Sequence, residues 1–332
     1  MMLHRRLRLV HLVPSLRCNM ACPYCYTSAG NRAVGFAPEK LRYVCAKLND
    51  LAFECLHLEG GEPFADEPGL ATVVETLLAR GRVQIVTNGT LLPERLFSMC
   101  CAKGFTRFIV SVDGNKLGHR WTRGNTYDII LRNLQLMLRE GCSVAISCTV
   151  HGRNVVGLSE MFDELISIGV QDFRIGDVIP VGRARSYEEW LHLQSDHHML
   201  LLHEIVNLPK DIPVSFSLQA SRISGSFVAA LKQMGYDCIT AGCHSAKDQF
   251  CVTSEGDLYG CYNLIGFLRR SEHPLNLFEC CNFSEALDAL EATATEQACP
   301  VYSGGHFFAN RQVAPKTNEV TSENPNPAPQ CR

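Results

Sequence analysis

The chain has 332 residues, of which 46% are hydrophobic, so it is long and apolar enough for one large folded domain with an appendage. Its net charge of -3, with Lys and Arg scattered along the chain, argues against nucleic-acid and membrane partners. No apolar run reaches the ~18 residues of a membrane span, and Arg8 and His11 interrupt the amino-terminal run, so we expect a cytoplasmic protein without a signal peptide.

Between residues 7 and 180, short runs rich in apolar and β-branched residues alternate with amphipathic stretches. Strands are predicted at 7–13, 54–59, 83–87, 107–112, 143–150 and 172–177. Helices are predicted between them, at 37–51, 67–81, 92–104, 125–141 and 158–169. Six β-α units in series predict a parallel sheet with helices outside it.

Because a complete barrel needs eight strands, the expected fold is α/β, a partial (β/α)6 TIM-type barrel, with an open doubly wound sheet as the alternative. Both place ligands at the carboxyl ends of the strands. Beyond residue 185, helices are predicted at 187–206, 221–235 and 283–297, and 249–262 reads as two short strands with a turn at 255–257. We divide the chain into a barrel core at 1–184, a helical bridging segment at 185–237, a small α+β cysteine-rich extension at 238–312 and a disordered tail at 313–332.

Seventeen cysteines are many for a reducing compartment, where clustered cysteines are better interpreted as metal ligands or redox groups. Cys18, Cys22 and Cys25 lie in the loop after the first predicted strand. A structural zinc site or a saturated iron-sulfur cluster needs a fourth ligand, and no Cys or His follows within the next eighteen residues. Three ligands leave a metal position open, as a catalytic metal requires.

The segment "CNMACPYC" (18–25) resembles the CxxxCxxC signature of the radical S-adenosylmethionine (radical SAM) enzymes. The resemblance implies that the three cysteines bind a [4Fe-4S] cluster whose fourth iron chelates SAM, and Tyr24 matches the aromatic residue before the last cysteine. It further implies an electron donor of the flavodoxin or ferredoxin type, and cleavage of SAM to a 5′-deoxyadenosyl radical that abstracts a hydrogen from the substrate.

Further motifs follow the next predicted strands. "EGGEP" (59–63) resembles the GGEP motif that binds the methionine amino group, and its residues suit this, because glycines let a ligand approach and a carboxylate pairs with an ammonium. An ordinary turn is the alternative there, and a solvated loop cation is the alternative for Arg123. The resemblance implies SAM-binding roles for Gly60, Gly61 and Glu62, for Asn88 in "TNGT", for Ser111 and Asp113 in "SVDG", and for Arg123 in "HRWTRGN".

The cysteine-rich extension resembles the SPASM or twitch extensions of a subgroup of this family. The resemblance implies one auxiliary [4Fe-4S] cluster on Cys243, Cys261 and Cys299, whereas Glu296 stands where a second cluster would need a cysteine. The fourth ligand is open among Cys238, Cys251, Cys280, Cys281 and a non-cysteine group. An extension without a cluster is the alternative.

The expected substrate is a ribosomally made peptide or a protein side chain, changed by oxidation, cross-linking or epimerisation. Cys148, Cys251 and Cys281 are candidate hydrogen donors for epimerisation. One alternative is an epimerase or dehydrogenase of an amino sugar or another small natural-product intermediate. A second, from a different class, is a non-catalytic metal-binding or electron-transfer protein. His57 alternates within its strand, so facing the barrel interior is one alternative, but a structural histidine is the commoner case and is expected here.

Overall fold

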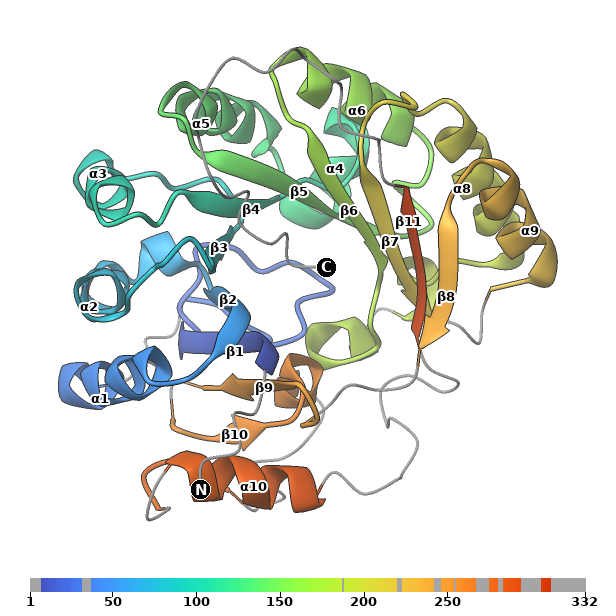
Figure 1. Ribbon diagram of the computed structural model, residues 1–332. Coiled ribbons are helices and arrows are strands. Elements are labelled where there is room, and N and C mark those ends of the chain that lie inside the picture. Colours follow the sequence, from blue (N-terminus) through green and yellow to red (C-terminus); the bar gives the residue numbers. More distant parts are fainter. Residues whose placement is uncertain are drawn as a thin grey trace, which may run out of the picture.

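The computed structural model describes residues 7–31, 37–186, 188–219, 223–241, 246–253, 255–266, 275–279, 283–293 and 306–311. The strands of these segments form one curved sheet around a central space, and most helices pack on its outer face (Figure 1). The order of the eleven strands is β10-β9-β1-β2-β3-β4-β5-β6-β7-β11-β8. The sheet therefore ends at β10 and β8 without closing, which confirms the predicted α/β partial barrel.

Seven strands run parallel in the order of the sequence, and the first six confirm the predicted strands. They are β1 (Leu7–Ser15), β2 (Phe53–Gly60), β3 (Val83–Thr87), β4 (Arg107–Ser111), β5 (Ser143–Val150), β6 (Asp172–Asp177) and β7 (Val214–Gln219). The helices between them are α1 (Pro38–Asn49), α2 (Glu67–Thr76), α3 (Glu94–Ala102), α4 (Lys116–Arg123), α5 (Tyr127–Arg139), α6 (Leu158–Ser167), α7 (Glu188–Leu191) and α8 (Ser195–Val206). The helix expected at 187–206 is divided into α7 and α8, and α4 was not predicted.

Alternation along the strands separates the hydrophobic core from the inside of the barrel. In β2, Leu56 and Leu58 are fully buried in the core beneath the helices. Their neighbours His57 and Glu59 line the central cavity instead. The inside of the barrel is thus partly polar, and it is a cavity for ligands.

The segment 185–237 is not wholly helical, which corrects the expected bridging segment. Its strand β7 joins β6 in parallel. The residues "VSFSLQ" alternate as a half-buried strand requires, with Val214, Phe216 and Leu218 buried and the serines between them less so. The sheet therefore continues past the six predicted units.

The carboxyl-terminal strands extend both ends of the barrel sheet. β9 (Gln249–Val252) pairs in parallel with β1, and β10 (Leu258–Tyr259) returns antiparallel to it, after the predicted turn at which Gly256 has φ +80°. At the other end, β11 (His306–Arg311) lies antiparallel between β7 and β8 (Asp237–Ala241). Two further α-helices are α9 (Gly225–Gln233) and α10 (Phe283–Thr293), and the tail expected at 313–332 lies outside the described residues.

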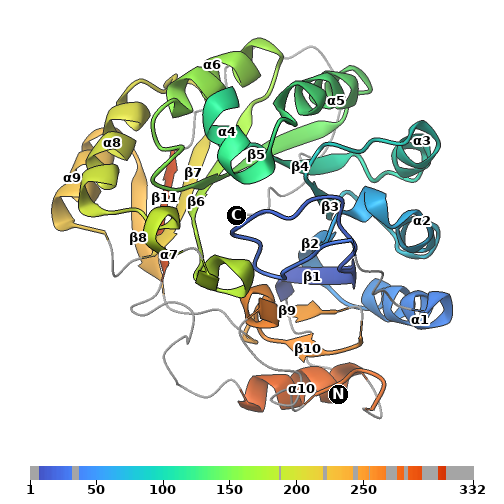
Figure 2. The same cartoon turned by 180° about the vertical axis from the view of Figure 1, so that it is seen from behind.

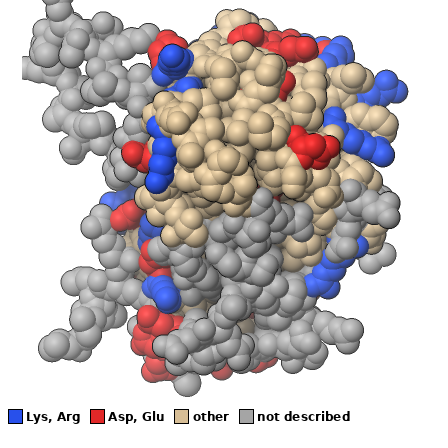
Figure 3. All heavy atoms as spheres, turned by 90° about the vertical axis from the view of Figure 1, so that its right-hand side faces the viewer, with Lys and Arg blue, Asp and Glu red and all other residues tan. Residues whose placement is uncertain are grey.

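The view from behind shows the loop after β1 crossing one mouth of the barrel (Figure 2). On the face that carries α9 and β8, basic and acidic side chains are interspersed among uncharged ones (Figure 3). Within the described residues, no helix combines the length and the hydropathy needed to cross a membrane.

Candidate active site

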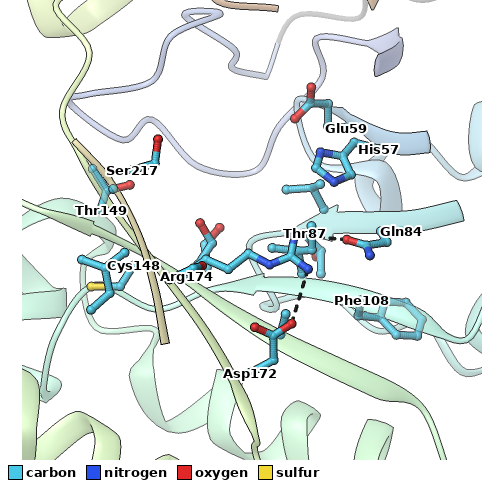
Figure 4. Close-up of a pocket in the computed structure, with 18 of the residues that line it drawn as sticks. His57, Glu59, Gln84, Thr87, Phe108, Cys148, Thr149, Asp172, Arg174 and Ser217 are labelled. Atoms are coloured by element: carbon cyan, nitrogen blue, oxygen red, sulfur yellow. Dashed lines mark hydrogen bonds and ion pairs between the residues drawn. The ribbon is translucent and has the colours of Figure 1, made fainter. Parts of the chain in front are cut away.

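A cavity of about 1090 Å³ occupies the inside of the barrel. Cys18, Cys22 and Cys25 line it at the end where the parallel strands terminate. Figure 4 shows side chains of β2, β3, β5 and β6 pointing into the same space. The three thiols of "CNMACPYC" therefore lie where the rule for parallel sheets places a ligand.

Backbone hydrogen bonds hold the cysteine loop from two sides. The Cys18 N–H donates to the Gly30 carbonyl over 2.7 Å, which closes the loop onto itself. From the 3-10 helix Gly182–Ser186 that follows β6, Arg183 donates its side-chain Nε to the Cys22 carbonyl over 2.9 Å and its backbone N–H to the Cys25 carbonyl over 3.1 Å. The thiols are thus fixed by segments far apart in the sequence.

The glycines of "EGGEP" lie directly behind the cysteine loop. The Gly61 N–H donates to the Ser15 carbonyl over 2.9 Å, and the Glu62 N–H donates to the Arg17 carbonyl over 2.8 Å. A Cβ atom at Gly61 would lie 2.0 Å from the Arg17 carbonyl oxygen. Only glycine permits this approach, so one role of the motif is to support the loop that carries the cysteines.

The chemistry of the three thiols suits a metal cluster. Burial raises the pKa of Cys18 to about 11 and also raises the pKa of Cys22. Bound metal provides the positive charge that offsets this penalty and keeps coordinating thiols deprotonated. The Met20 N–H also donates to the Cys18 sulfur over 3.4 Å, a bond that stabilises a thiolate.

Glu62 is buried, 1% exposed, and its carboxylate is engaged within the chain. It accepts the Asn88 N–H over 2.7 Å, the Thr87 hydroxyl over 2.8 Å and the Phe64 N–H over 3.1 Å. Burial raises the pKa of Glu62 to about 7, although these hydrogen bonds oppose the shift. Glu62 thus ties the end of β2 to the end of β3, and its predicted contact with the SAM amino group stays a prediction.

Asp113, Arg123 and Tyr24 form one buried group. Arg123 donates its Nε to Asp113 Oδ2 over 2.8 Å, and the Tyr24 hydroxyl donates to the same carboxylate oxygen. The Arg123 side chain lowers the pKa of Asp113 to about 2, although burial opposes this. The structure brings these three predicted residues together at the cysteine loop, where the Tyr24 hydroxyl bonds to the ion pair of Arg123 and Asp113.

Other predicted residues differ in their placement. Asn88 and Ser111 line the cavity, whereas Cys148 borders it from the hydrophobic core, where it packs with Ile146 and Val150 and is 1% exposed. Cys251 is fully buried between Val13 and Tyr259 and does not line the cavity. Cys261 is partly exposed. Four other cysteines of the prediction, Cys243, Cys280, Cys281 and Cys299, lie outside the described residues.

The sequence interpretation missed two polar groups of the cavity wall. Arg174 on β6 donates to Gln84 Oε1 over 3.2 Å and contacts Asp172 Oδ2 at 3.4 Å (Figure 4). The second group comprises His11, His57 and Glu59 on β1 and β2. Alternation within each strand indicates which side chains face inward, but the pairing of strands decides which of them meet.

Comparisons with known proteins agree with the site. The sequence pattern of the radical SAM superfamily matches residues 12–164, which include the three cysteines of the loop, "EGGEP", "SVDG" and Arg123. Residues 12–164 of this chain therefore carry a radical SAM domain. Radical SAM enzymes use a [4Fe-4S] cluster and SAM, and these are its cofactors. The three cysteines of the loop fit the cluster, and the cavity that they line fits SAM.

This radical SAM chain is 23% identical over 261 residues to an AdoMet-dependent heme synthase of Methanosarcina barkeri, covering 74% of this chain and 73% of the relative. It is 24% identical over 252 residues to the mycofactocin maturase MftC of Mycobacterium tuberculosis, covering 74% of this chain but only 61% of the relative. Its fold is similar to that of Streptococcus suis SuiB bound to the precursor peptide SuiA, with a TM-score of 0.66, 14% identity, and coverage of 88% and 67% of the two chains. The maturase supports the subgroup with a SPASM- or twitch-type extension, and the likeness to SuiB is one of fold.

Proposed function

We propose that this radical SAM chain cleaves SAM reductively and uses the radical to remove a hydrogen from a side chain of a ribosomally made peptide. The observation that carries the proposal is the cavity of about 1090 Å³, with three cysteines at its mouth and polar side chains inside. This volume is at the upper end of ordinary ligand pockets, about 300–1,000 Å³, and suits SAM together with a substrate side chain. When bound, the cluster and SAM supply a 5′-deoxyadenosyl radical.

The residues of the chain position these groups. Cys18, Cys22 and Cys25 hold the cluster, and the backbone of Gly60 and Gly61 with Asn88 and Ser111 forms the SAM side of the cavity. Arg123 keeps N–H donors for the SAM carboxylate, because a guanidinium has five donors and Asp113 and Tyr24 take two of them. The surrounding barrel wall shields the radical from water and from other hydrogen donors.

Two similar proteins support a peptide substrate. One is a maturase, and the other is bound to a precursor peptide. The net reaction is oxidation, cross-linking or epimerisation. Cys148, which borders the cavity from the hydrophobic core, and Cys281 are the candidate hydrogen donors for epimerisation, whereas Cys251 does not border the cavity. A flavodoxin or ferredoxin supplies the electron, and one auxiliary cluster on Cys243, Cys261 and Cys299 takes part in electron transfer.

The test is anaerobic reconstitution with iron and sulfide, reduction in the presence of SAM, and measurement of 5′-deoxyadenosine. Replacing Cys18, Cys22 and Cys25 together by Ala abolishes the product, whereas the matched variant Cys101→Ala, in α3 away from the cavity, retains it. Equal product from the triple variant would falsify the proposal. Replacing Cys243 and Cys261 leaves some SAM cleavage that is uncoupled from substrate.

Substrate class is tested separately with short precursor peptides encoded beside the gene. A mass change in the peptide that requires the three cysteines supports the proposal. Turnover of an amino sugar or another small intermediate, with no change in any such peptide, rejects the peptide class.

A further inference from the structure

Two histidines and a glutamate meet on the barrel wall, where Glu59 directly precedes the glycines of the SAM-binding motif. His11 on β1 lies directly opposite His57 on β2 in the parallel register, and Glu59 follows two residues along the same face. One ligand atom from each side chain lies within 4.8 Å of the other two. The imidazole rings are 5.3 Å apart and nearly perpendicular. Figure 4 shows His57 and Glu59 together at the cavity.

Within the described residues, two ring nitrogens of this group have no hydrogen-bond partner. His11 is 2% exposed and Glu59 is 8% exposed, and the His11 Nδ1 lies 2.5 Å from Glu59 Oε1. The Nε2 atoms of His11 and His57 are both buried without a hydrogen-bond partner in the described part of the chain. Each unpaired buried polar atom costs about 1–3 kcal/mol, so an arrangement with two of them calls for a ligand.

The donor set identifies the ligand by its chemistry. Imidazole nitrogens and one carboxylate suit borderline divalent metals, and two histidines with one carboxylate leave further coordination positions open. Burial lowers the pKa of His57, which keeps this imidazole in the neutral form that binds metal. Arg174, the cation nearest in Figure 4, is occupied by Gln84 and Asp172.

We propose that His11, His57 and Glu59 bind one divalent cation, Zn²⁺ or Fe²⁺, on the wall of the barrel cavity. All three side chains line the cavity that the cluster cysteines also line, so the open positions of the ion face the substrate space. There the ion takes an oxygen or nitrogen donor of the substrate and orients it. This role is separate from SAM cleavage, which the cysteine loop performs.

Aromatic rings connect this metal site to the cysteine loop. Tyr262 packs on His11 with 4.6 Å between ring centroids and on Tyr26 with 5.2 Å. Tyr26 follows Cys25 directly in the loop, and its buried hydroxyl has no hydrogen-bond partner among the described residues. A movement of His11 on metal binding would therefore pass through Tyr262 to Tyr26, which is next to Cys25.

The experiment uses the full chain with its clusters reconstituted anaerobically, and Co²⁺ as the probe, since Co²⁺ is distinguishable from cluster iron. The expected result is one Co²⁺ per chain, by dialysis and elemental analysis, with the weak absorption of nitrogen and oxygen ligands. His57→Gln and Glu59→Gln should each weaken binding by at least about 10-fold. The matched variant His203→Gln, on the exposed face of α8, should bind Co²⁺ as the wild type does.

Two results overturn the proposal: a wild-type cobalt spectrum that shows only sulfur-to-metal charge transfer, and binding that is unchanged in both His57→Gln and Glu59→Gln. The wild-type spectrum decides the matter even where a variant folds poorly. Cluster absorbance and the unfolding midpoint, measured for each variant, separate loss of the site from loss of the fold. Formation of 5′-deoxyadenosine reports on the proposed function independently.

Discussion

Arg123 and Asp113 form a buried ion pair, with 2.8 Å between Nε and Oδ2 and side chains that are 9% and 0% exposed. Arg123 ends α4, and Asp113 follows β4, so the pair fixes this helix at the mouth of the barrel. Tyr24 joins them from the cysteine loop. These predicted SAM-binding residues are thus hydrogen-bonded to one another, and this orders the site before any ligand binds.

Breaking this pair from one side should cost much more than breaking an exposed one. Arg123→Met leaves the Asp113 carboxylate buried and uncompensated, so we expect the free energy of unfolding to fall by about 3–5 kcal/mol. Lys116→Met is the control, because Lys116 and Asp128 are 2.7 Å apart but 69% and 59% exposed. Its expected cost is below about 1 kcal/mol. Urea unfolding measures both, and equal losses would contradict the structural role.

A methyl group at Gly61 should prevent cluster assembly. The Cβ of Gly61→Ala would lie 2.0 Å from the Arg17 carbonyl, and the loop that carries the cysteines would have to move. Gly30→Ala is the matched control. Gly30 lies in the loop that carries the cysteines, and a Cβ there has no atom within 4 Å. We expect iron and sulfide contents to fall sharply in the first variant and to stay unchanged in the second. Full cluster loading of Gly61→Ala would show that the close approach is dispensable.

Local patterns in the sequence were sufficient for the barrel core. The six predicted strands and the cysteine loop depend on alternation and turns that lie within short segments, and they are confirmed. Strand β7 carried the same signal, but it lies in a segment interpreted as a helical bridge. The order of the sheet, with β9 beside β1, depends on segments more than two hundred residues apart and has no local signal.

The sequence likewise could not predict which polar side chains contact one another. His57 was expected to be structural because that is the commoner case for a histidine in a strand, and only the register of β1 with β2 brings His11 to it. Asp113 and Arg123 were each assigned to SAM from their motifs, and the turn into α4 brings them together. Motifs indicated which residues matter, whereas tertiary contacts decide what each one touches.

His119 should make the stability of the protein depend on pH between about 6.5 and 4. It is fully buried, its Nδ1 accepts the Asp113 N–H over 3.2 Å, and burial lowers its pKa from 6.5 to about 4. The unfolded chain therefore binds the proton more strongly, and the free energy of unfolding falls as the pH drops through this window. The complete effect is about 3 kcal/mol, reached below pH 4.

His119→Gln should remove this part of the pH dependence. Urea unfolding of the cluster-free protein at several pH values provides the measurement, and acid loss of the cluster does not then contribute. The exposed His203→Gln is the control and should keep the wild-type slope. His151 is retained in every variant, so its own titration cancels from the comparison. A slope that is the same with and without His119 would reject this assignment.

Glu62→Gln tests whether the carboxylate holds the ends of β2 and β3 together. Gln is the same size, but its amide nitrogen replaces either Oε2, which accepts the Asn88 N–H, or Oε1, which accepts the Phe64 N–H and the Thr87 hydroxyl. One buried donor then lacks a partner, and we expect a loss of about 1–3 kcal/mol of unfolding free energy together with weaker SAM binding. The exposed Glu39→Gln in α1 should change stability by less than about 0.5 kcal/mol. Urea unfolding and calorimetric titration with SAM measure the two effects, and if SAM affinity alone fell, Glu62 would act as a ligand rather than as a structural tie.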